Sequence, residues 1–172
     1  MSFSFKEYRT RITWLSMGLV GSLLIAQLIS NFEDTLRENL ILASFIPLVV
    51  YISDAVGTQM ESIIIRTLST EKHFDIKTFF SNQFLLTFTV GLTLSIIAGV
   101  GVFIFFDGIS LAITVSLGLL GGIISSLFSG IIIPYYFWKF HQDPAEASGP
   151  IATVIQDFIS IFVFFLVASV IM

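Results

Sequence analysis

Three acidic residues lie inside long apolar stretches of this sequence, and they are the side chains best suited to chemistry. Asp157 lies within the run 151–172, and Asp54 and Glu61 lie in an earlier run. An ionised carboxylate at the centre of a bilayer helix costs roughly 3 kcal/mol or more, so it normally faces protein or water and serves a function. Two interpretations of Asp157 stay open: a hydrogen bond that holds a neighbouring helix, or a cation site.

Asp54 and Glu61 are seven residues apart, which is two helical turns, so they share one helix face with Gly57 and Thr58. A stripe with two carboxylates has to face water, a cation or a basic partner. The basic residue nearest in sequence, Arg66, is five positions from Glu61, a poor spacing for a helical pair. We therefore expect Asp54 to line an aqueous ion path rather than to have a structural role. For Glu61 both roles stay open, and a further alternative is that its side chain reaches the membrane interface.

The composition is that of a polytopic membrane protein. Hydrophobic residues make up 55% of the chain, charged residues 12%, and 19 of 172 residues are Phe, which exceeds the needs of a soluble core of this size. The chain has no cysteine, so neither disulfides nor thiolate metal ligands contribute. A net charge of -4 argues against a basic patch for phosphates, and no nucleic-acid partner is expected.

Five apolar stretches are long enough to cross a membrane as helices, at about 20 residues per crossing. They cover residues 12–30, 40–65, 79–106, 109–138 and 151–172. The sequence thus predicts an all-α fold with five transmembrane helices in one domain, 1–172. Pro150 follows Gly149, and a proline suits the first helical turn, so the fifth helix is expected to begin near Pro150. Asp143 and Glu146, just before it, either attract a cation or cap this helix.

The basic residues predict the orientation. With the N-terminus in the cytoplasm, seven of the eight basic residues lie on the cytoplasmic side and Arg37 alone lies outside. We expect a multi-pass protein of the inner or plasma membrane whose C-terminus is outside. Since no small-residue cleavage site follows the first span, that span is expected to be retained.

Small residues recur every four positions in two of the apolar stretches. The two series are Gly118, Gly122, Ser126 and Gly130, and Gly91, Ser95 and Gly99. Such stripes let helix backbones approach closely in a membrane, and we expect them to pack helices rather than to line a pore.

Two motifs resemble the MgtE family of magnesium transporters and channels. In the second apolar stretch, Ile46-Pro47-Leu48, Gly57-Thr58-Gln59 and the run 66–70 are similar to the family's second membrane helix, and the run 66–70 is also similar to eukaryotic solute-carrier relatives. The sequence DPAEASGP at 143–150, followed by Thr153 and Asp157, is similar to the family's fourth-to-fifth helix connection and pore helix.

The resemblance implies a two-fold dimer of five-helix protomers with the cation path between the second and fifth helices of both chains. It implies that Asp157 holds the principal magnesium site, with the backbone at Thr153 one turn earlier, and Gly149 in the preceding motif is a further candidate. The family's usual Gly-Gly-Asn is replaced here by Ser53-Asp54-Ala55, which adds a carboxylate. The stretch before the first span is short, so regulation by the family's cytosolic N-terminal and CBS domains is not expected.

The sequence thus predicts a homodimer in membrane lipid that passes a divalent cation inward down its electrochemical gradient. Mg²⁺ is the foremost candidate, and Mn²⁺, Co²⁺ and Ca²⁺ are not separable from it by ligand type. The alternative within transport is a carrier or exporter coupled to Na⁺ or H⁺. A remote alternative is an intramembrane aspartyl hydrolase that uses Asp54 and Asp157 as a dyad, but the Gly-x-Gly-Asp context of such proteases is missing, and we do not expect an enzyme.

Overall fold

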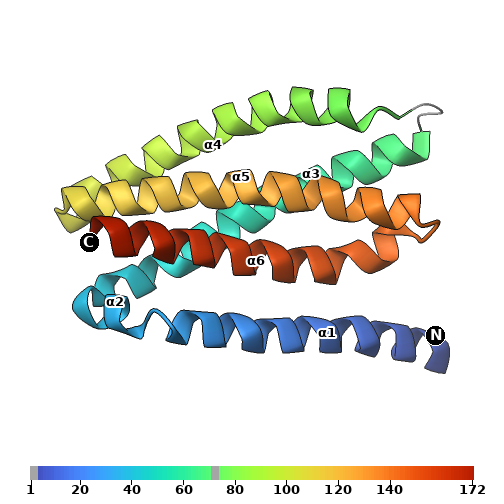
Figure 1. Cartoon of the computed structure of the whole chain (residues 1–172), viewed down its shortest axis with the longest axis horizontal. Helices are drawn as coiled ribbons and strands as arrows, with labels where there is room; N and C mark the ends of the chain where they lie inside the picture. The colour runs from blue at the N-terminus through green and yellow to red at the C-terminus, as the bar shows by residue number, and fades with distance from the viewer. Residues whose placement is uncertain (1–3, 71–73) are drawn as a thin grey trace.

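The computed structural model describes residues 4–70 and 74–172, and all regular secondary structure in this part of the chain is helical. Its elements in chain order are α1 (Phe5–Ser30), α2 (Glu33–Glu38), the 3₁₀ helix η1 (Leu40–Phe45), α3 (Ile46–Thr70), α4 (Ile76–Phe106), α5 (Ile109–Lys139) and α6 (Pro144–Ile171). Five segments within these residues are long and apolar enough to cross a membrane. The predicted all-α fold with five spans is confirmed, and the two chain ends lie at opposite ends of the bundle (Figure 1).

The predicted start of the last helix is wrong, because α6 begins six residues earlier than expected, at Pro144. Asp143 is its N-cap and accepts a hydrogen bond from the backbone N–H of Ala145 at 2.9 Å. Pro144 then occupies the first turn, where its missing N–H is not needed. Pro150 lies inside the helix instead. Of the two predicted roles for Asp143, capping is the one the structure shows.

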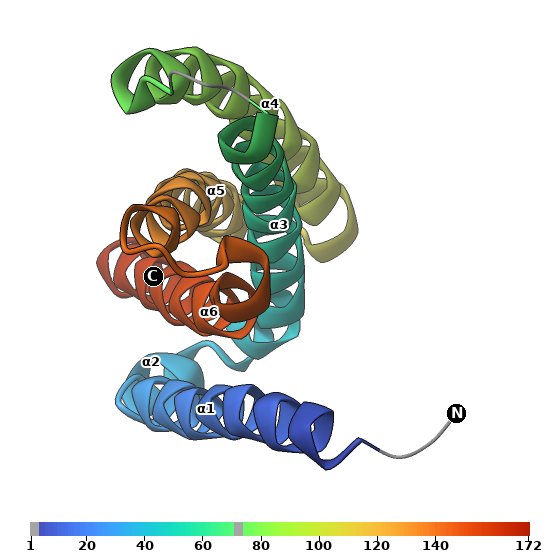
Figure 2. The ribbon, with the colours of Figure 1, turned by 90° about the vertical axis from the view of Figure 1, so that its right-hand side faces the viewer.

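The helices pack around α5. This helix contacts α3, α4 and α6, and α3 also contacts α6, so α3, α5 and α6 form a central trio. The end-on view shows α1 lying against α6 on one side and α4 on the opposite side of the trio (Figure 2). Because α5 is covered by three neighbours, it supplies much of the buried core, including Val115, Leu119, Ile123, Leu127 and Ile131.

The small-residue stripes pack helices, as predicted. A Cβ atom added to Gly118 would lie 2.6 Å from the Phe164 ring of α6, and one added to Gly130 would lie 2.8 Å from the backbone oxygen of Gly57 on α3. At Gly91 an added Cβ would lie 3.0 Å from Ile123. Glycine is therefore required where α5 meets α3 and α6 at backbone distance.

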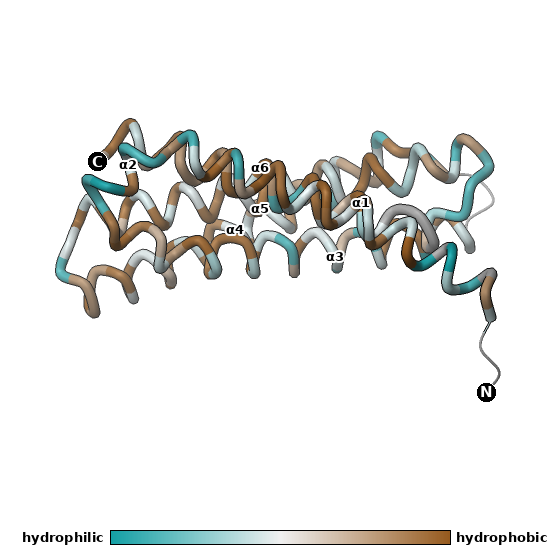
Figure 3. Tube along the Cα trace, turned by 90° about the horizontal axis from the view of Figure 1, so that it is seen from below, coloured by the Kyte–Doolittle hydropathy of each residue, from teal (hydrophilic) through white to brown (hydrophobic). Residues whose placement is uncertain are grey.

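The outer helices expose apolar side chains, as a lipid-facing surface does. Leu15, Leu19 and Leu23 of α1, and Ile97 and Ile104 of α4, are each more than half exposed. The trace coloured by hydropathy shows hydrophilic residues gathered toward the two ends of the bundle and mainly apolar ones between (Figure 3). This distribution fits a bilayer whose hydrocarbon covers the middle of the helices.

Two residues, Asp107 and Gly108, connect α4 to α5. Asp107 ends α4 in the left-handed conformation, with φ 47° and ψ 47°. Aspartate is among the residues that adopt this conformation as single positions. Gly108 is the N-cap of α5 in an extended conformation. The chain therefore reverses direction within two residues.

Candidate functional site

The three intramembrane acids are brought together where α3 meets α6. Asp54 and Asp157 are half-buried, and Glu61 is 8% exposed. Asp54 lies near enough to the other two for its charge to repel each of them. The structure therefore gathers on one seam the acids that the sequence singled out, two from α3 and one from α6.

Three buried oxygen atoms on this seam receive no hydrogen bond from the described residues. They are Oδ1 of Asp54, Oδ1 of Asp157 and the side-chain oxygen Oε1 of Gln156. Buried polar oxygens are nearly always paired, so a group of unpaired acceptors points to an ion or water. Carboxylate and amide oxygens are the ligands that hard divalent cations take. The unpaired oxygens of this seam thus fit a cation.

Gln156 is a member of this seam that the sequence analysis missed. It is 1% exposed, and its Nε2 donates a hydrogen bond of 2.9 Å to Oε1 of Glu61. The available signal was its position: Gln156 falls on the every-fourth-residue series that α6 buries, with Ala152, Ser160 and Phe164. A polar residue on such a face has to find a partner on a neighbouring helix.

Gly57 provides the space for this contact. A Cβ atom added there would overlap the side-chain amide of Gln156, so that amide rests directly on the α3 backbone. Gly57 lies three residues after Asp54 and four before Glu61, between the two acids on the α3 face. The Gly-Thr-Gln motif at 57–59 therefore begins with a residue whose small size the α3–α6 contact requires.

The two other predicted site residues, Thr153 and Gly149, lie on α6 with Asp157. Thr153 and Gly149 precede Asp157 by four and eight residues, so all three lie along one face of α6. Thr153 is exposed, and no atom lies within 4 Å of a Cβ added to Gly149. At Thr153 and Gly149 this face is open within one protomer.

No three acidic or histidine side chains among the described residues lie close enough together to hold a metal ion. One protomer therefore does not form an all-carboxylate cage from these residues. Mg²⁺ seldom needs such a cage, since it usually keeps several waters and binds one or two carboxylates.

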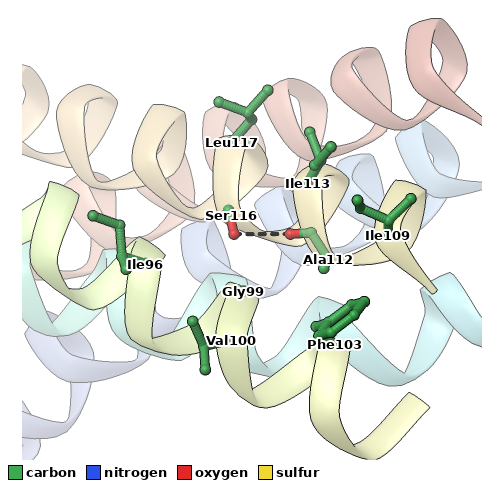
Figure 4. Close-up of a pocket in the computed structure, with 9 residues that line it drawn as sticks. All are labelled: Ile96, Gly99, Val100, Phe103, Ile109, Ala112, Ile113, Ser116 and Leu117. Atoms are coloured by element: carbon green, nitrogen blue, oxygen red, sulfur yellow. Dashed lines mark hydrogen bonds between the residues drawn. The ribbon is translucent and has the colours of Figure 1, made fainter. Parts of the chain in front are cut away.

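The structure also has a cavity of about 490 Å³ between α4 and α5, which differs in character from the seam. The close-up shows it lined by apolar side chains, including Ile96, Val100 and Phe103 of α4, while the Ser116 hydroxyl donates to the backbone oxygen of Ala112 on its own helix (Figure 4). Because the Ser116 hydroxyl is already engaged, this cavity offers no set of ligands for a cation. We interpret this cavity as a lipid-facing groove between α4 and α5.

The fold and the seam together define an all-helical, multi-pass membrane protein with carboxylates buried between two of its spans. The comparison with known proteins then gives the family. Residues 46–167 match the family model MgtE, described as a divalent cation transporter. The match covers α3 to α6 nearly completely, and the chain belongs to the MgtE family.

Three relatives carry the name magnesium transporter MgtE. The chain is 32% identical to that of Bacillus subtilis over 92% of its own length and 36% of the relative's. It is 30% identical to that of Enterococcus faecalis over 97% of its length and 37% of the relative's. For that of Thermus thermophilus the identity is 24%, over 94% and 36%. The chain thus spans a little over a third of the length of these relatives.

Proposed function

We propose that this chain carries a divalent cation, Mg²⁺ foremost, across the membrane along a path beside α3 and α6. The observation that carries the proposal is the pair of buried, unpaired carboxylate oxygens on Asp54 and Asp157, which come from different helices. Like charges held together inside a membrane are costly unless a cation neutralises them. Membership of a family of divalent cation transporters supports the same assignment.

In this proposal Asp157 is the principal ion ligand, because it lies at the edge of the α6 face that stays open in one protomer. Thr153 and Gly149, on the same face, offer a hydroxyl and backbone oxygens that hold the waters of a hydrated ion. Asp54 forms a second, weaker position across from Asp157. Glu61 was also predicted to line the path, but Gln156 holds one of its oxygens, and we give it no direct contact with the ion.

The functional unit in this proposal is a two-fold homodimer. One protomer supplies a single Asp157, whereas a two-fold axis beside the open face of α6 brings two copies to one ion. Mixing wild-type protein with the Asp157→Asn variant in equal amounts tests this. If both copies are needed, about a quarter of randomly formed dimers stay active; independent protomers retain about half of the flux, which contradicts the dimer.

The direction proposed is inward, with the N-terminus in the cytoplasm and the C-terminus outside. At about 100 mV, inside negative, a divalent ion gains roughly 4.6 kcal/mol on entry, twice the value for a single charge. Uptake therefore needs no coupled ion and no ATP. The aspartyl hydrolase alternative has no support from the family, which is one of transporters.

Flux into proteoliposomes tests the proposed function. Purified protein is reconstituted, Mg²⁺ entry is followed with an internal indicator, and the membrane voltage is set with K⁺ and valinomycin. We expect entry that rises with inside-negative voltage and is reduced by competing Mn²⁺, Co²⁺ or Ca²⁺. Entry that requires an imposed Na⁺ or H⁺ gradient would favour the coupled carrier, and no entry of any divalent ion would refute the proposal.

A further inference from the structure

The hydrogen bond between Gln156 and Glu61 joins two membrane-spanning helices through their side chains, and the proposed ion path does not use it. The two residues are 95 positions apart in the sequence, and the bond is buried. A buried donor or acceptor that loses its partner is costly, so the folded protein keeps this bond formed. The contact is therefore a fixed point between α3 and α6.

The position of Gln156 gives this fixed point a consequence for its neighbour. Gln156 immediately precedes Asp157, and successive residues of an α-helix point about 100° apart. Holding the Gln156 amide against Gly57 and Glu61 sets the rotation of α6 about its own axis. The same rotation determines where the Asp157 carboxylate points.

We propose that Gln156 and Glu61 are positioning residues that aim Asp157 at the ion path and thereby set ion discrimination. This inference rests on the proposed function, in which Asp157 is the ion ligand. Mg²⁺ demands near-ideal octahedral geometry, whereas Ca²⁺ accepts six to eight ligands in flexible arrangements. A loosely held Asp157 therefore weakens Mg²⁺ more than Ca²⁺. Glu61 in this role needs an acceptor oxygen and not a negative charge.

Two substitutions at Glu61 separate the hydrogen bond from the charge. Glu61→Gln keeps a side-chain oxygen that accepts from Gln156, and Glu61→Leu removes the acceptor without leaving an unpaired charge. We expect Glu61→Leu to lower the discrimination of Mg²⁺ over Ca²⁺ by about tenfold, the effect of losing one such bond. We expect Glu61→Gln to stay within about twofold of wild type. The measurement is the half-saturating concentration of each ion in proteoliposome flux.

Gln156→Met completes the test, since methionine keeps the length of the side chain and loses the donor. If the two residues act through one bond, the double variant Glu61→Leu/Gln156→Met is no worse than either single variant. Should Gln156→Met fail to assemble, the comparison of the two Glu61 variants decides alone. Phe165→Leu is the control, because Phe165 is fully buried on α6 more than two turns away. It should lower stability and leave discrimination unchanged.

The inference is overturned if Glu61→Gln loses discrimination as Glu61→Leu does, because the charge then matters rather than the bond. Unchanged discrimination in Glu61→Leu, additive effects in the double variant, or an equal loss in Phe165→Leu overturn it as well. Its failure is distinct from failure of the proposed function, which is read from Asp157→Asn. If that variant loses flux while the Glu61 and Gln156 variants discriminate normally, only the positioning role falls.

Discussion

The seam between α3 and α6 and the groove between α4 and α5 are both contacts between helices, but their side chains differ in polarity. The seam buries Asp54, Glu61, Gln156 and Asp157, and three of its oxygens have no hydrogen-bond donor among the described residues. The groove is lined almost wholly by apolar side chains. In both contacts a glycine lets the neighbouring helix approach closely: Gly57 at the seam and Gly99 at the groove.

This difference supports the proposed ion path along the seam. Polar groups in a bilayer are tolerated when they face protein, water or an ion, and their cost makes a group of them a mark of function. Close packing by glycine serves stability at either place. Helix approach alone therefore does not mark a path, whereas the unpaired carboxylate oxygens of the seam support one.

The largest expected effect comes from removing the charge of Asp157. Asp157→Asn is expected to reduce Mg²⁺ flux to background while the protein stays folded, because an amide oxygen replaces the principal carboxylate. Asp157→Glu keeps the charge and should lower flux in part through altered geometry. Asp107→Asn in the α4–α5 turn is the matched control and should transport normally. Wild-type flux in Asp157→Asn would remove the seam from the ion path.

A smaller effect is expected at Asp54. Asp54→Asn should weaken Mg²⁺ binding and lower flux less than Asp157→Asn does, because a path with several moderate sites still conducts when one is weakened. Isothermal titration and flux on the same variant provide the test. If both are unchanged, Asp54 has a structural role and Asp157 is the one seam acid left on the path.

Two Gly→Ala substitutions compare the packing of the centre and the periphery. Gly130→Ala places a methyl group 2.8 Å from the backbone oxygen of Gly57, so α5 and α3 have to move apart. We expect a loss of about 1–3 kcal/mol, seen as a lower melting temperature in detergent. Gly101→Ala on α4 meets no atom within 4 Å and should be neutral or slightly stabilising. Equal effects would mean that close approach does not distinguish the two regions.

The smallest effect concerns the start of α4, outside the membrane. Asp75 caps this helix, and the hydroxyl of Thr78, which donates to it at 2.6 Å, lowers the pKa of Asp75 below its ordinary value of 3.8. A lowered pKa in the folded state means that the stabilising contribution is present above about pH 3.8 and is lost as the pH falls through the lower, folded value. Asp75→Ala should thus slightly lower the melting temperature at pH 7 and make no difference at strongly acidic pH. A constant difference at all pH values would contradict this.

The fold was largely predictable because long apolar runs leave few alternatives in a membrane. Every predicted span is helical, although the span 40–65 covers the 3₁₀ helix η1 as well as most of α3, since all backbone groups within lipid must be paired inside the segment. The start of α6 was not predictable from the sequence, because both Pro144 and Pro150 suit a first helical turn. The Asp143 side chain decides between them by capping at the earlier position.

The candidate site was predictable in part. Asp54, Glu61 and Asp157 were recognisable because a charge within an apolar run is costly and stands out from its neighbours. The family resemblance implied that the second and fifth spans meet at these acids. The contact of Gln156 with Glu61 was not predictable, because it depends on how α6 is rotated against α3. Gln156 is uncharged, so its cost in the sequence is small, and its importance appears only when its partner is known.

The two-residue turn between α4 and α5 has a consequence for how the protein enters the membrane during synthesis. The helices on either side are 31 residues each, and a two-residue turn is too short to let one of them insert while the other remains outside the membrane. We therefore expect the two helices to integrate together as a hairpin, with Asp107 as the one charged side chain in the turn between them. Lengthening this loop with polar residues would therefore affect the topology reached during biosynthesis before it affects the finished bundle.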